Sequence, residues 1–153
     1  MTESTDRIER QIHLSAPRSK VWQALIQPGE FGQWFGVALQ GEAFVEGKHA
    51  KGYITHPGYE HLLCDFLVDR IEPERRFGLR WHPYAVDPDK NYDDEPTTLV
   101  MFELEDAPGG TLLRVVESGF DAIPVERRAE AFRMNSQGWE QQMENIQRYV
   151  ATH

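Results

Sequence analysis

Glu117 and His82 are the residues of this 153-residue chain whose types best suit acid–base chemistry. Glu117 follows Leu113 and Val115 at a spacing of two, and alternate side chains of a β-strand point to the same face. We therefore expect Glu117 to face inward, unless the strand ends at the solvent-exposed mouth of the fold. A buried carboxylate needs hydrogen-bonding partners, and it could orient a ligand or act as a general base. His82 and Tyr84 are its expected partners if the segment after them folds back.

A second group of residues is large and mostly aromatic, and we expect it to line an internal cavity. Rings that carry one polar group suit a planar apolar ligand. Each ring could equally be a core residue that fills the interior, so both interpretations stay open. The expected ligand-binding residues, with Glu117 as the polar anchor, are Trp34, Phe35, Tyr53, Phe66, Trp81, Phe102, Glu117, Trp139 and Met143.

Metal and cofactor chemistry are not expected. His56, His61 and Cys64 flank a Pro-Gly turn, but His61 and Cys64 are three residues apart on a strand and point to opposite faces. No fourth zinc ligand is evident. The chain also contains no phosphate loop, dinucleotide fingerprint or Ser-His-Asp arrangement. We expect no cofactor, and enzymatic activity is less favoured than binding.

The composition restricts the classes of partner. The chain has 25 acidic and 16 basic residues and a net charge of -9, which disfavours nucleic acid and anionic membrane surfaces. It has one cysteine, no apolar run long enough to span a bilayer, and a polar start unlike a signal peptide. We therefore expect a cytoplasmic protein of one domain, residues 1–153, that binds a small apolar molecule. A homodimer is left open.

The apolar periodicity predicts an α+β fold in which helices lie on one face of an antiparallel sheet. One long amphipathic helix, from Pro124 to Val150, must cover all the strands, so the sheet has to curve around it. A polar, acidic loop from Pro83 to Pro96 is expected to cap one end of the space between them. The expected strands are residues 7–14, 37–39, 43–45, 50–55, 61–71, 76–81, 97–105 and 111–120, with short helices after Pro17 and at 30–35.

Several segments, in this order, resemble the SRPBCC (START-like) superfamily, and most closely its branch related to the activator of heat-shock protein 90 ATPase. They are residues 16–25 (APRSKVWQAL), 33–35 (QWF), 71–73 (IEP), 79–82 (LRWH), 110–113 (GTLL), 117–120 (ESGF) and 138–143 (GWEQQM). The resemblance covers essentially the whole chain. It implies a helix-grip fold with a cavity under the C-terminal helix.

Fold alone does not decide function, because this superfamily includes carriers, cyclases, hydrolases and co-chaperones. The favoured function is binding of a small hydrophobic or aromatic ligand. One alternative is a cyclase or hydrolase that uses Glu117 and His82 as a general acid–base pair. The other is a co-chaperone-like protein-interaction module, although an Hsp90-binding N-terminal domain is not among these residues, so activation of Hsp90 itself is not expected.

Overall fold

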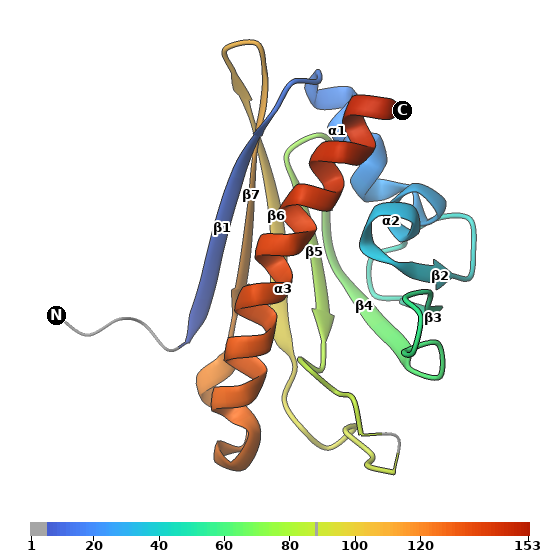
Figure 1. Ribbon diagram of the computed structural model, residues 1–153, viewed down its shortest axis with the longest axis vertical. Helices are drawn as coiled ribbons and strands as arrows, with labels where there is room; N and C mark the ends of the chain where they lie inside the picture. Colours follow the sequence, from blue (N-terminus) through green and yellow to red (C-terminus); the bar gives the residue numbers. More distant parts are fainter. Residues whose placement is uncertain (1–5, 88) are drawn as a thin grey trace, which may run out of the picture.

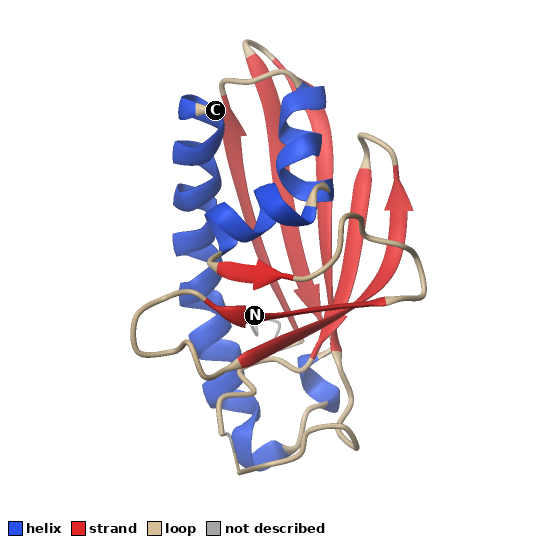
Figure 2. Cartoon of the chain, turned by 90° about the vertical axis from the view of Figure 1, so that its right-hand side faces the viewer, coloured by secondary structure: helices blue, strands red, loops and turns tan. Residues whose placement is uncertain are grey.

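Seven antiparallel strands form one curved sheet, and a long C-terminal helix crosses its concave face (Figures 1 and 2). The computed structural model describes residues 6–87 and 89–153. The polar start of the chain, which was expected to be unlike a signal peptide, lies largely outside these residues. The sheet order is β1-β7-β6-β5-β4-β3-β2. The strands are β1 (Arg7–Leu14), β2 (Val37–Leu39), β3 (His49–Ile54), β4 (Leu63–Glu72), β5 (Arg76–Trp81), β6 (Thr98–Ala107) and β7 (Gly110–Ser118).

The helices have the predicted arrangement. Helices α1 (Arg18–Ile26) and α2 (Pro28–Phe35) follow the first strand, and α3 (Val125–Thr152) follows the short 3-10 helix η1 (Phe120–Ala122). Helix α3 contacts β1, α1 and α2, and its buried stripe includes Trp139, Met143, Ile146 and Val150. The predicted helix-grip fold is confirmed. No helix in the described part of the chain is long and apolar enough to cross a membrane.

Two local predictions were wrong. Residues 43–45 were expected to form a strand, but they lie in a loop between glycines with positive φ, Gly41 and Gly47. Phe44 is buried there because its ring packs against Phe31 and Phe77, which explains the apolar pattern without a strand. The second short helix was expected at residues 30–35, but it begins two residues earlier, at Pro28, whose fixed φ suits the first turn.

Aromatic rings fill the space between α2 and the sheet. Phe31 on α2 is fully buried, and its ring lies within 6.5 Å of six others, measured between centroids. They belong to Trp34, Phe35, Phe44, Phe66, Phe77 and Phe102. Gly36 then ends α2 in the left-handed conformation, with φ of 94°. The end of α2 thereby places Phe35 beside α3.

The sheet edge at β1 carries a polar contact to α3. Arg10 interrupts the apolar face of β1, and its guanidinium donates to Ser136 Oγ at 2.6 Å. Since β1 has a neighbour only on one side, Arg10 can reach past the sheet to the helix. This contact lies one residue from Asn135, which contributes to the site described next.

Candidate functional site

The carboxylate of Glu117 is fully buried on β7 and is the centre of a hydrogen-bonded cluster. Its Oε2 accepts hydrogen bonds from Trp81 Nε1 at 2.7 Å and Thr98 Oγ1 at 2.5 Å. Its Oε1 accepts from Trp139 Nε1 at 2.8 Å. Asn135 Nδ2 lies 2.9 Å from Oε1 and 3.1 Å from Oε2. We call these five residues the Glu117 cluster.

Strand register and helix periodicity bring the cluster together. Trp81 and Thr98 are direct partners in the β5–β6 pair, at the end of one strand and the start of the next. Glu117 lies opposite Val100 in the β6–β7 pair, two residues along β6 from Thr98. Asn135 and Trp139 are four residues apart on α3 and therefore share one face of the helix. The cluster thus ties three neighbouring strands to the helix.

Each oxygen of Glu117 accepts a hydrogen bond from an indole N–H, and the amide of Asn135 donates to both. Indole and amide nitrogens can donate hydrogen bonds but not accept them, so both carboxylate oxygens receive protons from their neighbours. The ion pairs found among the described residues do not involve Glu117. Neutral donors, rather than a cation, therefore compensate for its burial, and every one of them is needed because an unpaired buried polar group is costly.

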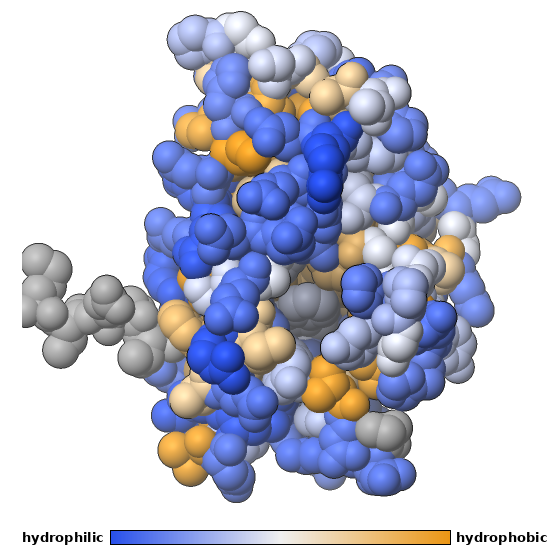
Figure 3. All heavy atoms as spheres, in the orientation of Figure 1, coloured by the Kyte–Doolittle hydropathy of each residue, from blue (hydrophilic) through white to orange (hydrophobic). Residues whose placement is uncertain are grey.

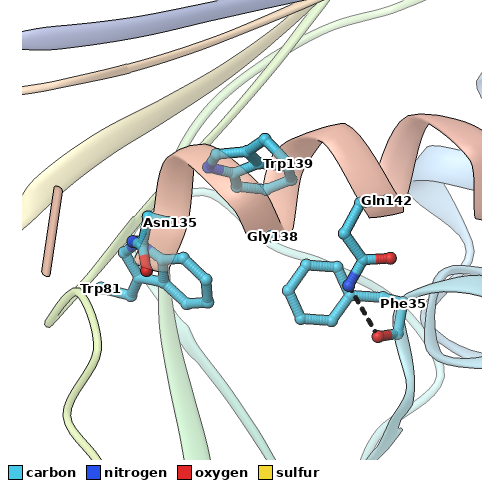
Figure 4. A pocket seen from close by; sticks show the side chains of 6 residues that line it. All are labelled: Phe35, Trp81, Asn135, Gly138, Trp139 and Gln142. Carbon is cyan, nitrogen blue, oxygen red and sulfur yellow. Dashed lines mark hydrogen bonds between the residues drawn. The ribbon is translucent and has the colours of Figure 1, made fainter. Parts of the chain in front are cut away.

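A small cavity lies against this cluster, beside the middle of α3. Its volume is about 70 Å³, and the space-filling view shows the surface hollowed at this place (Figure 3). The residues that line it are Phe35, Trp81, Asn135, Gly138, Trp139 and Gln142 (Figure 4). Trp81, Asn135 and Trp139 therefore face the cavity and also donate to Glu117, whose carboxylate lies behind them and does not itself line the space.

Gly138 shapes the mouth of the cavity. A Cβ atom built at this position would have no neighbouring atom within 4 Å, apart from the helix itself. Gly138 is exposed and borders open space, so it does not serve close packing of the helix against the sheet. On the next turn, Gln142 Nε2 donates to the backbone oxygen of Phe35 at 2.9 Å and ties α3 to the end of α2.

The remaining residues that were expected to line a cavity lie elsewhere. Trp34, Phe66, Phe102 and Met143 are buried in the core, where Trp34 Nε1 donates to the oxygen of Ala24. Tyr53 does not lie on the concave side: 53% of it is exposed. Ala50 and Gly52 occupy the inward positions of β3, so the alternation turns Tyr53 outward.

The structure does not bring His82 or Tyr84 to Glu117. His82 Nε2 lies 3.0 Å from the backbone oxygen of Glu95, within the loop that joins β5 to β6. The expected acid–base pair is therefore not formed in this structure. Among the described residues, no group of three or more His, Cys, Asp or Glu side chains is placed to hold a metal ion.

The described residues of the loop between β5 and β6 are anchored to the start of α3 by an ion pair. Arg127 Nε donates to Glu95 Oε1 at 2.7 Å, and Arg127 Nη1 donates to the oxygen of Pro83 at 2.6 Å. Lys90 Nζ also lies 2.9 Å from Glu95 Oε2. Burial alone would raise the pKa of Glu95, but the hydrogen bonds and charges of Arg127 and Lys90 outweigh it and lower the pKa below its ordinary value.

Sequence reasoning missed Thr98, Asn135 and Gln142. Thr98 is fully buried, but a threonine at the start of a strand resembles any β-branched strand residue. Asn135 offered a usable signal, because it lies four residues after Ala131 and four before Trp139 on the buried stripe of α3. A polar residue in such a stripe must find a buried partner, and a glutamate on an inward strand position is a natural one.

Comparison with known proteins gives a family match over most of the chain. The model of the family described as Activator of Hsp90 ATPase homolog 1-like protein matches residues 15–151. Among curated proteins, polypeptide N-acetylgalactosaminyltransferase 12 of Mus musculus is 34% identical over 65 residues, and that of Homo sapiens over 64. The matched stretch is 42% of this chain, and the chain spans only 11% of the transferases' length.

Solved structures share the fold at low sequence identity. Protein MLL2253 from Mesorhizobium loti has a TM-score of 0.74 at 23% identity, with 95% of this chain and 97% of that chain covered. For the Aha1 dimer from Colwellia psychrerythraea the TM-score is 0.70 at 18% identity, with 94% and 95% covered. For DynU16, from the dynemicin biosynthetic locus, it is 0.71 at 24%, with 96% and 48% covered. At these identities the similarity establishes the fold alone.

Proposed function

This chain belongs to the family of Activator of Hsp90 ATPase homolog 1-like proteins, and we propose that it functions by binding a small apolar or aromatic molecule in the cavity beside α3. The observation that carries the proposal is the construction of the cavity wall. Three aromatic rings line it, and the only hydrogen-bond donors of its two indoles are occupied by Glu117. The rings therefore present apolar surface to an occupant, as small-molecule sites commonly do.

The size of the cavity limits what can enter. Sites for drug-sized ligands measure about 300–1,000 Å³, several times the 70 Å³ found here. The cavity accepts one small ring or head group, while the rest of a larger ligand would extend past Gly138 toward solvent. Wider opening requires breaking the hydrogen bond from Gln142 to Phe35, which joins α3 to α2.

Binding is favoured over catalysis because the cavity lacks an acid–base pair. His82 is engaged with the backbone of Glu95, and the oxygens of Glu117 are occupied by four donors behind the wall. A general base must come within hydrogen-bonding reach of the substrate proton. Glu117 therefore supports the wall residues rather than meeting the occupant.

The test is a titration with small neutral aromatic compounds, phenol and indole, followed by ¹H–¹⁵N NMR. The indole N–H signals of Trp81 and Trp139 should shift saturably, because their rings line the cavity. That of Trp22 serves as the internal reference, since Trp22 lines neither this cavity nor a second hollow, which Trp34 borders. Native mass spectrometry of freshly purified protein should also reveal a co-purified small molecule.

Two substitutions at Gly138 give a matched control. Gly138→Leu should fill the mouth of the cavity and abolish the shifts, whereas Gly138→Ala should leave most of the space free and retain them. Both should fold, because the position faces open space on a helix. If the wild-type signals do not move at any soluble concentration and no molecule co-purifies, the binding proposal is wrong.

A protein-interaction module is the second candidate, and the small volume of the cavity together with the family match favours it. In that case the interior is a closed core and the outer surface carries the function, in a monomer or in a dimer like that of Aha1 from Colwellia psychrerythraea. Sedimentation velocity measures the oligomeric state. An Hsp90 ATPase assay with and without the chain tests the activity that the family description suggests.

A further inference from the structure

Three aromatic rings surround the cavity in a nearly regular triangle. The ring centroids of Phe35, Trp81 and Trp139 lie 6.0, 6.1 and 6.1 Å apart. The rings are tilted to one another by 43° to 60°, so they do not stack on each other and close the space. An occupant seated over this triangle lies within about 6 Å of all three centroids, the range over which an aromatic face attracts a cation.

A buried negative charge lies behind two of the three rings. Trp81 and Trp139 each donate the indole N–H to Glu117, at 2.7 and 2.8 Å. An N–H that donates to a carboxylate leaves its ring richer in electrons, which strengthens the negative face that a cation meets. The carboxylate also lies close to the cavity, and its charge attracts a cation there over a short distance.

The polar group of the wall offers an acceptor. Asn135 lines the cavity, and because its Nδ2 is held by both oxygens of Glu117, the amide is oriented with Oδ1 at the other end. The described residues that line the cavity include no Lys, Arg or His. An anionic occupant would therefore meet aromatic faces, a carbonyl-type oxygen and a nearby carboxylate, and the donor in the wall, the amide of Gln142, is already bonded to the backbone oxygen of Phe35.

We propose that the cavity selects a small N-methylated ammonium group, whose surface is apolar methyl and whose charge is positive. This inference rests on the proposed binding function and names the ligand class. The volume of about 70 Å³ suits such a head group, with any attached chain leaving past Gly138. The net charge of -9 raises the local concentration of cations around the protein and assists capture.

The experiment compares choline with 3,3-dimethylbutan-1-ol, a neutral molecule of the same shape in which carbon replaces the ammonium nitrogen. Affinities are measured by isothermal titration calorimetry and by the indole N–H shifts of Trp81 and Trp139. Choline should bind about tenfold more tightly or better. If the two bind equally, the charge-based inference is overturned while the binding function stands. If neither these nor the neutral rings bind, both proposals fail.

Variants of Trp81 locate the interaction. Trp81→Leu removes one aromatic face at a half-buried position and should reduce the preference for choline over the neutral molecule. Trp81→Phe keeps a ring but loses the hydrogen bond to Glu117, so its preference should fall between wild type and Trp81→Leu. Both variants are checked for folding by circular dichroism. Unchanged choline preference in folded Trp81→Leu would place the cation elsewhere and overturn the inference.

Discussion

The buried carboxylate of Glu117 is the residue on which the site depends. It accepts hydrogen bonds from two indoles, an amide and a hydroxyl, and these donors come from two strands and the long helix. Because three of the donor side chains also line the cavity, Glu117 fixes their orientation. A single side chain thus sets both the connection of α3 to the sheet and the shape of the cavity.

Replacing this carboxylate by its neutral amide should destabilise the protein. In Glu117→Gln one oxygen becomes an NH₂ group, which faces N–H or O–H donors and leaves at least one of them unpaired. We expect the free energy of unfolding, measured with urea, to fall by about 2–4 kcal/mol.

The matched control is Glu105→Gln, an exposed carboxylate near the far end of β6, which should change stability by no more than about 0.5 kcal/mol. A Glu117→Gln variant as stable as wild type would mean that the donors do not depend on a carboxylate.

At the scale of elements, side-chain hydrogen bonds hold α3 at several places along its length. Arg127 anchors its start to Glu95, the Glu117 cluster holds its middle, and Gln142 joins the following turn to α2. The cavity lies at the second and third of these connections, and Gly138, between Asn135 and Trp139, borders it. The helix is therefore attached to the rest of the fold on both sides of Gly138.

The anchor at Glu95 should weaken in acid. Its pKa is lowered in the folded state, so the stabilisation is present above the ordinary carboxyl value of 4.5 and is lost as pH falls through the folded-state pKa. Glu95→Gln should lower the free energy of unfolding by about 1–2 kcal/mol at pH 7. The difference in free energy of unfolding between wild type and Glu95→Gln should shrink as the pH falls below 4.5 and through the folded-state pKa.

Urea unfolding of wild type and variant across this pH range makes the comparison. Glu140→Gln, at an exposed position on α3, is the control and should show no such pH-dependent difference. If the free energies of unfolding of wild type and Glu95→Gln differ by the same amount at every pH, the role assigned to the ion pair is contradicted.

Gly138→Ala should stabilise the helix. Alanine is favoured over glycine in a helix interior by about 1 kcal/mol, and the added methyl group meets nothing within 4 Å. Thermal unfolding should show a raised Tm, whereas Gln137→Ala on the neighbouring exposed position should change it little. A lowered Tm would show that the space beside Gly138 closes in solution.

The sequence predicts the elements better than the site. Alternation in β7 was sufficient to place Glu117 inside, because Leu113 and Val115 fix the phase of the strand. Its partners could not be derived in the same way. Trp81 and Thr98 become neighbours only through the register of β5 with β6, and periodicity within a segment contains no information about register between segments.

For the molecule as a whole, Cys64 offers a probe of cooperative unfolding. Burial raises the pKa of its thiol to about 11, so the folded protein carries almost no thiolate at pH 8. Iodoacetamide should therefore react slowly with the native protein and rapidly in urea. The rate of this reaction should rise over the same urea concentrations at which the tryptophan side chains become exposed. Rapid reaction in the absence of urea would show that β4 opens independently of the rest.

The order of the Glu117 cluster along the chain has a consequence for how a newly made molecule acquires its structure. Trp81, Thr98 and Glu117 leave the ribosome first, and the sheet can be complete at Ser118. At that moment the carboxylate has only two of its four donors, because Asn135 and Trp139 have not yet emerged from the ribosome. Water must supply the missing hydrogen bonds until the last helix arrives. The sheet of a nascent chain therefore stays hydrated at its centre, and the emergence of α3 is the step that removes this water.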